Sequence, residues 1–85
     1  MSKDKSLRIF VVENDHQTRV DLRRFYEGMG HEVLSSATSA EALRILDHIL
    51  KPDLFLIGNP FSGEMFSFLS NSERFRSIPV ASILR

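Results

Sequence analysis

The sequence predicts an α/β protein built on a parallel sheet with helices on both faces. Short β-branched and aromatic runs, at residues 7–12, 31–35, 54–57 and 78–84, alternate with stretches in which apolar residues recur every three or four positions. Strands and helices that alternate in this way form parallel sheets, and right-handed crossovers leave very few topologies. The length of 85 residues suits one domain.

The first strand–helix unit begins with residues 7–12, which are apolar on both faces, as in a central parallel strand. Asn14 or Asp15 is expected to cap the helix that follows. Gly30 suits the left-handed position just past the end of that helix. The expected apolar stripe of the helix consists of Thr18, Leu22, Phe25, Tyr26 and Met29.

The second unit contains a weak strand at 31–35 and a helix introduced by a capping box. In this motif the Thr38 hydroxyl accepts a hydrogen bond from the Glu41 amide, and the Glu41 side chain reaches back. The apolar side of this helix is expected to consist of Ala42, Leu43, Leu46, Ile49 and Leu50.

The second half of the chain continues the alternation. Residues 54–57 read as a buried third strand, and 58–63 as a loop by composition. A short helix is expected from 64 to about 70, with Met65, Phe66 and Leu69 inward. A polar connection with a buried Phe75 then leads to a fourth strand at 78–84.

The composition excludes several classes of protein. Hydrophobic residues make up 42% and charged residues 26%, as in ordinary soluble proteins, and the formal net charge of zero argues against nucleic-acid binding. The absence of cysteine excludes disulfides and zinc–thiolate sites. No signal peptide or membrane-spanning run is evident, so a cytoplasmic protein is expected. No phosphate-binding glycine motif follows the first strand, and we expect no metal and no cofactor.

Several short motifs, in order, resemble the receiver domain of bacterial response regulators. VVEND at 11–15 resembles an apolar strand ending in acids, residues 52–54 resemble the start of the acceptor strand, and 78–80 resemble the start of the fourth strand. Further matches in spacing are Arg19, Leu22, Tyr26, Gly30, Ala37, Ser39, Glu41, Ala42 and Leu43. The resemblance implies a flavodoxin-like, three-layer parallel sheet over residues 7–85, after a flexible N-terminus at 1–6. It would be shortened to about four strands and three helices, without the fifth strand and last two helices.

The resemblance also implies a phosphorylation site that this chain lacks. In the family, paired acids after strand one hold magnesium, and an aspartate ending strand three accepts the phosphoryl group. Glu13 matches the first acid, Asn14 replaces the second, and Asp15 is expected to cap the helix more than to bind metal. Gly58 occupies the acceptor position and has no side chain to act as nucleophile.

Other parts of the family's site are missing too. Leu84 stands at the hydroxyl position that ends strand four, and the lysine of strand five has no counterpart. Ser82, two residues earlier, is expected to be a buried hydroxyl. Asp53 lies at the opposite edge of the sheet, roughly 16 Å from position 58. We therefore expect a pseudo-receiver, not an enzyme, that acts by contact in two-component (phosphorelay) signal transduction.

The expected contact surface is the fourth strand, whose apolar edge carries no charge before Arg85. We expect it to be covered in a homodimer or by another signalling protein. The candidate contact residues are Phe61, Phe68, Val80, Ser82 and Leu84.

One question about the length of the chain and two alternative functions stay open at this point. The chain is either naturally short, and self-associates, or a fragment of a longer protein. It could be a phosphorylation-competent receiver whose site is misaligned. It could also be a small α/β nucleotide-binding or enzyme fragment.

Overall fold

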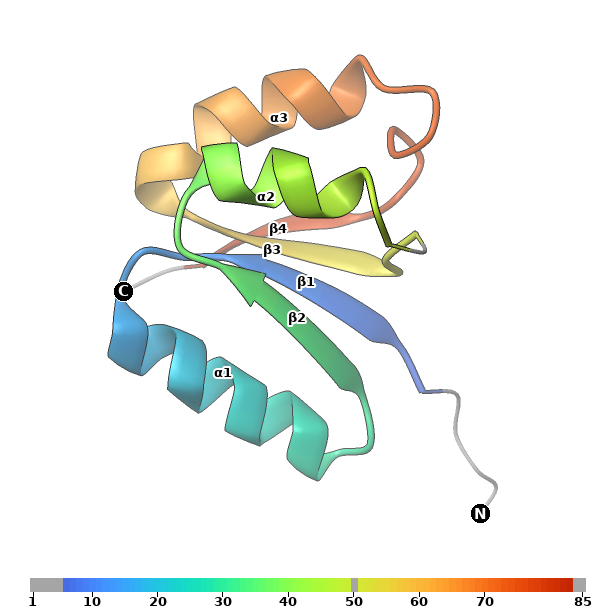
Figure 1. Ribbon diagram of the computed structural model, residues 1–85. Coiled ribbons are helices and arrows are strands. Elements are labelled where there is room, and N and C mark those ends of the chain that lie inside the picture. Colours follow the sequence, from blue (N-terminus) through green and yellow to red (C-terminus); the bar gives the residue numbers. More distant parts are fainter. Residues whose placement is uncertain (1–5, 50, 84–85) are drawn as a thin grey trace.

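Strands and helices alternate along the chain as the sequence predicts (Figure 1). The computed structural model describes residues 6–49 and 51–83, so Leu50, Leu84 and nearly all of the N-terminus expected to be flexible lie outside the described residues. The elements are β1 (Arg8–Val12), α1 (His16–Gly28), β2 (Glu32–Ser36), α2 (Ser39–Leu46), β3 (Leu54–Gly58), the 3-10 turn η1 (Asn59–Phe61), α3 (Ser62–Ser70) and β4 (Val80–Ile83).

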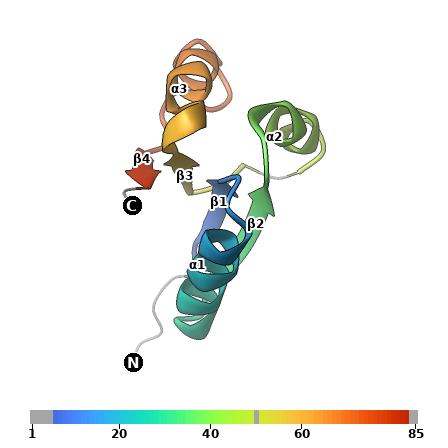
Figure 2. The same ribbon diagram turned by 90° about the vertical axis from the view of Figure 1, so that its left-hand side faces the viewer.

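The strands form one parallel sheet in the order β2-β1-β3-β4. This is the flavodoxin-like topology that the sequence predicts. Figures 1 and 2 show three layers, with α2 and α3 on one face of the sheet and α1 on the other, beside β1 and β2. Among the described residues, no helix has the length and apolar character needed to cross a membrane.

The core consists of two clusters, one on each face of the sheet. Alternation along the strands assigns neighbouring residues to opposite faces, so Phe10 and Val12 point toward α2 and α3 while Ile9 and Val11 point toward α1. The first cluster comprises Phe10, Val12, Ala42, Leu46, Phe55, Ile57, Met65, Leu69 and Phe75. The second comprises Ile9, Val11, Val33 and Leu56.

The predicted helix caps are present. The Asp15 carboxylate accepts from the Thr18 amide at 2.9 Å, and the Thr38 hydroxyl accepts from the Glu41 amide at 3.1 Å. The Glu41 side chain accepts from the Ala37 amide, one residue earlier than a standard capping box. Gly30 has a φ of 92° after the end of α1, where the chain turns toward β2.

The apolar stripe predicted for α1 is only partly buried. Leu22 and Tyr26 pack on the second cluster, but Phe25 and Met29 are 59% and 55% exposed. A helix that lies on a sheet buries a narrow line of residues at four-residue steps, and side chains on its flanks stay in solvent.

The region after β3 also differs from the prediction. Residues 58–63 were expected to form a loop, but Gly58 ends β3, and η1 and the start of α3 occupy residues 59–63. Pro60 favours this outcome because its fixed φ suits the first turn of a helix. Phe66, expected to point inward, is 42% exposed, whereas Phe75 is buried as predicted.

Candidate functional site

The carboxyl ends of the strands meet at one edge of the sheet, where parallel α/β folds place their sites. Glu13 follows β1 there, and Gly58 ends β3. The register pairs Val12 with Ile57, so these two residues are the next positions along neighbouring strands. The structure therefore brings Glu13 and Gly58 together, the two residues that were predicted to match the first acid and the acceptor.

Glu13 is fully buried and connects three elements. Its backbone N–H donates to the Ser36 carbonyl oxygen at 3.0 Å, which continues the β1–β2 pairing by one residue. Its carboxylate Oε2 accepts from the Asp15 amide at 2.8 Å. Its carbonyl oxygen accepts from Arg19 Nη1, on α1, at 2.7 Å. Glu13 thus joins the end of β1 to β2 and to the start of α1.

The Glu13 carboxylate occupies the space beside Gly58. A Cβ placed on Gly58 would overlap Glu13 Oε1, and it would lie 3.2 Å from both Glu13 Cδ and the Val12 carbonyl oxygen. Glycine at position 58 therefore provides no nucleophile, and the structure shows a steric reason for its presence as well. Glycine allows this close approach because it has no side chain.

Asn14 and Asp15 are the other two residues of the predicted vestigial acidic site. Asn14 is exposed. The Asp15 carboxylate accepts from both the backbone N–H and the hydroxyl of Thr18, the latter at 2.6 Å, so it acts as the helix cap. In the ranges that the structure describes, no group of three or more histidine, aspartate or glutamate side chains could hold a metal ion.

Asp53 lies at the other edge of the sheet, as predicted. Its carboxylate accepts from the Arg8 amide at 2.8 Å, and Arg8 also pairs with Glu32 at 2.9 Å. These contacts fix the beginnings of β1, β2 and β3. Asp53 therefore stabilises the sheet and is too far from Gly58 to replace an acceptor there.

The side chains of the outer strand β4 alternate between the two faces of the sheet. Its register with β3 pairs Val80 with Phe55 and Ser82 with Ile57, which assigns both to the face covered by α3. Ala81 and Ile83 belong to the opposite face. Ser82 is exposed, so the prediction of a buried hydroxyl was wrong. The reason is its place on β4, which pairs with β3 alone among the residues that the structure describes.

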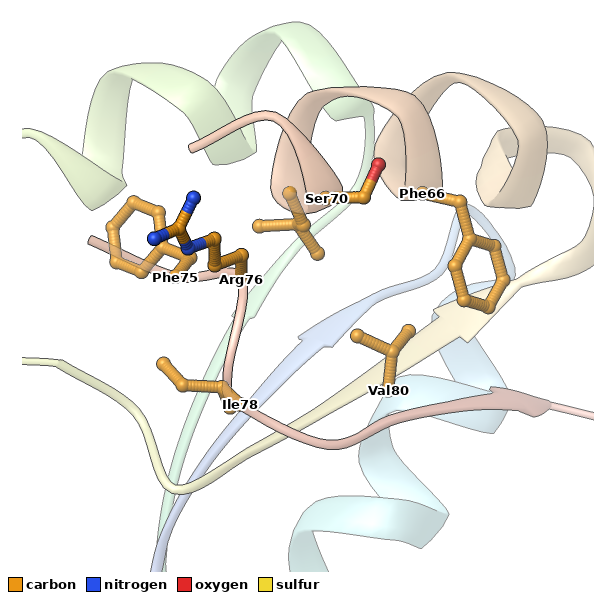
Figure 3. A pocket seen from close by; sticks show the side chains of 7 residues that line it. Phe66, Ser70, Phe75, Arg76, Ile78 and Val80 are labelled. Carbon is orange, nitrogen blue, oxygen red and sulfur yellow. The ribbon is translucent and has the colours of Figure 1, made fainter. Parts of the chain in front are cut away.

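A groove of about 230 Å³ runs between α3 and β4 (Figure 3). Phe66 from α3 and Val80 from β4 point toward one another across it, which explains why Phe66 is exposed. Its volume is below the roughly 300–1,000 Å³ of sites for small ligands and cofactors. The groove is lined by Phe66, Leu69, Ser70, Phe75, Arg76, Ile78 and Val80.

The predicted contact residues are distributed unevenly around this groove. Val80 lines it and Ser82 is exposed farther along the same strand. Phe68 is exposed, but it is not among the lining residues, and its ring lies 6.4 Å from that of Phe75. Phe61 is half-buried against the first core cluster, so it offers less contact surface than expected. Phe66 was expected in the core, but it is exposed and lines the groove, whereas Phe61 and Phe68, which were predicted to make the contact, do not line it.

Sequence reasoning missed the roles of several arginines. On α1, Arg19 donates to the Glu13 carbonyl oxygen and Arg23 donates to the Val33 carbonyl oxygen at 2.9 Å. Arg74 donates to the carbonyl oxygens of Leu46 and Ile49 at the end of α2. No local pattern marks Arg74, because its partners lie far back along the chain.

A comparison of the chain with models of known protein families found no match, and a comparison with curated protein sequences found none either. The function must therefore be inferred from the topology, from the filled position beside Gly58 and from the surface of β4.

Proposed function

We propose that this chain is a pseudo-receiver, a receiver-like module of bacterial two-component signalling that acts in the cytoplasm by protein contact and without phosphorylation. Two observations support the proposal. The sheet has the β2-β1-β3-β4 order expected for such a module. The position expected to accept a phosphoryl group is Gly58, and the space beside it is filled by Glu13.

The occupied position beside Gly58 carries this proposal. An acyl phosphate is formed when a carboxylate attacks the phosphorus atom of a donor, so the carboxylate must be reachable. Glu13 is the carboxylate nearest to the acceptor position, and it is fully buried. A donor in solvent therefore cannot approach it without local unfolding.

The surroundings of Glu13 also do not favour metal-assisted phosphoryl transfer. Magnesium sites draw their affinity from charged oxygen ligands, and the transferred group needs its negative charge neutralised in place. Asn14 brings no charge, and the Asp15 carboxylate is committed to capping α1.

Without phosphorylation, the chain would act by binding another protein, and the surface around β4 is suited to that binding. The partner is a second copy of the chain or another signalling protein. The groove beside β4 is mainly apolar, with Ser70 and Arg76 as its polar lining residues, and the formal net charge of the chain is zero. Both features favour a protein partner over a nucleic acid.

Incubation with a small acyl phosphate and Mg²⁺, followed by intact-mass measurement, tests the proposal. We expect no stable, magnesium-dependent gain of a phosphoryl group, while a receiver domain that has its acceptor aspartate gains one under the same conditions. A gain by this chain would overturn the proposal. A thermal-shift screen with nucleotides, flavins and Mg²⁺ adds a second check, because a clear shift would indicate a ligand-binding protein.

A further inference from the structure

The outer edge of β4 carries unused backbone hydrogen-bonding groups. The Phe55 amide donates to the Pro79 carbonyl oxygen at 3.0 Å, and Val80 is the register partner of Phe55. In a parallel ladder, alternate residues of a strand bond to the same neighbour. The N–H and C=O groups of Val80 and Ser82 therefore point away from β3. Within residues 6–49 and 51–83, no other strand pairs with that edge.

This edge also lacks the features that usually keep sheet edges apart. Natural edges are protected by charged side chains, by proline or by a covering segment. Residues 77–83 contain no charged side chain, and their proline, Pro79, precedes the strand. The formal net charge of zero adds no long-range repulsion between copies.

We infer that two copies of the chain pair through β4, antiparallel, about a two-fold axis that passes through Ala81. The inference rests on the proposed function and specifies its partner as a second copy. In this register, Val80 of each copy exchanges both backbone hydrogen bonds with Ser82 of the other. All of the outward-facing groups of β4 are then used, and the two sheets become one continuous sheet.

The side chains suit this register. Ala81 faces its own copy across the axis, in a non-hydrogen-bonded pair whose Cα atoms lie only about 4.5 Å apart, where a small side chain fits well. The axis runs perpendicular to the sheet, so both α3 helices lie on the same face. Phe66 and the groove beneath it then lie next to the equivalent surface of the second copy.

Side chains beside β4 would add to the contact. A stable interface buries about 800 Å² per partner, which is about 15% of the 5258 Å² exposed by the chain. Phe66 and Ile78 line the groove next to β4 and would contribute apolar area to the pairing. Backbone hydrogen bonds along β4 would fix its register.

Charge substitutions at Ala81 test both the pairing and the register. Ala81 is exposed, so Ala81→Glu and Ala81→Lys should leave the monomer folded. Light scattering should give twice the 9.7 kDa chain mass for the unaltered protein at micromolar concentration, and the monomer mass for each variant. An equimolar mixture of the two variants should recover the dimer, because opposite charges then face one another.

Three outcomes of this experiment would overturn the inference. They are an unaltered chain that is monomeric at micromolar concentration, variants that stay dimeric, and a mixture that stays monomeric. The first would favour a different protein as the partner, and the other two would place the interface elsewhere. None of them depends on phosphoryl transfer, so the proposed function stands or falls separately, by the mass assay.

A single cysteine provides a second, covalent measurement. The chain has no cysteine, so Ala81→Cys introduces one thiol per copy. A Cα separation of about 4.5 Å across the axis lies within the range for a disulfide. Mild oxidation should therefore convert most of this variant to a disulfide-linked dimer. Ala40→Cys, on the exposed side of α2, is the matched control and should stay largely uncrosslinked; equal crosslinking of both would overturn the register.

Ser82→Pro tests the hydrogen bonds themselves. Proline removes an N–H that points outward and leaves the bonds between β3 and β4 intact. This variant should lose the dimer at concentrations where Ser82→Ala keeps it, with unchanged far-ultraviolet circular dichroism. A Ser82→Pro variant that is folded and still dimeric would contradict pairing through this edge.

Discussion

At the scale of single residues, Glu13 and Gly58 depend on one another. The carboxylate of Glu13 extends into the space that any side chain at position 58 would need. It is held there because its backbone bonds to Ser36 and Arg19, and Oε2 bonds to the Asp15 amide. A glutamate reaches one methylene farther than an aspartate, so its length is what brings the carboxylate to Gly58.

We expect Gly58→Ala to destabilise the chain by about 1–3 kcal/mol, because the added methyl group forces the Glu13 carboxylate or the backbone to move. In a Glu13→Ala background the same substitution should cost clearly less, since the space is then open. Urea denaturation of the four proteins in this double-mutant cycle measures the coupling. Additive effects would contradict the close contact between the two residues.

The sequence could place these residues but could not predict their contact. Glu13 follows an apolar strand, where an acidic side chain commonly faces solvent, and nothing nearby in sequence indicates that it is buried. Its environment is created by Gly58, at the end of another strand. The resemblance to receiver domains predicts a glycine at the acceptor position, and that assignment stays a prediction. The filling of the space beside Gly58 depends on a contact between two strands that no local pattern shows.

At the scale of secondary structure elements, the start of α1 depends on Asp15. Asp15→Ala removes the acceptor for the Thr18 amide and should cost about 1 kcal/mol of unfolding free energy. Asn14→Ala is the matched control, because Asn14 is exposed and is not the capping residue, and it should change stability by less than about 0.5 kcal/mol. Equal losses from the two substitutions would argue against the cap.

The end of α2 depends on a residue from a distant segment. The Arg74 guanidinium binds the Leu46 and Ile49 carbonyl oxygens and lies 4.9 Å from the centre of the Phe75 ring. A cation at a helix C-terminus satisfies the last carbonyls and interacts favourably with the helix dipole. This contact holds the segment between α3 and β4 against α2.

Arg74→Ala should lower the unfolding free energy by about 1 kcal/mol. This is less than the loss expected for a buried hydrogen bond to a charged group, because Arg74 is exposed and solvent weakens the interaction. Arg74→Lys should recover only part of the loss, since an ammonium group lacks the planar fork that spans two carbonyls. Guanidinium denaturation at low protein concentration measures both. Full recovery by lysine would show that charge alone matters.

Features that depend on residues close together in the sequence were predicted correctly, whereas features that depend on contacts between distant segments were not. The caps at Asp15 and Thr38 and the turn at Gly30 are local, and the sequence predicts all three. The start of α3 was misplaced because the composition around Pro60 suits both a loop and a helical first turn. The orientation of Phe66 was wrong because it depends on the space left between α3 and β4.

At the scale of the whole molecule, alternation and handedness predict a parallel sheet with few possible topologies. The flavodoxin-like strand order, which the structure has, was implied by the resemblance to receiver domains. The two faces nevertheless differ, because α2 and α3 cover one face while α1 lies on the other beside β1 and β2 (Figure 2). Which side chains remain exposed follows from this asymmetry and from the outer position of β4. Sequence periodicity alone does not contain that information, so Phe25 and Met29 were assigned to the core.

The inferred pairing through β4 has a thermodynamic consequence for the whole molecule. An association that requires the folded state stabilises it by mass action, so the melting temperature should rise with protein concentration. We expect a measurable rise between low and high micromolar concentrations for the unaltered chain and none for Ala81→Glu. Scanning calorimetry provides the measurement, and a melting temperature independent of concentration would count against a folded dimer.

The contact between Glu13 and Gly58 also restricts the order in which mutations can accumulate. A side chain introduced first at position 58 meets the Glu13 carboxylate and passes through a destabilised intermediate. Shortening Glu13 first, for instance to aspartate, opens the space before it is needed. A lineage that gained a side chain at position 58 would therefore pass through a less destabilised intermediate if Glu13 were shortened first.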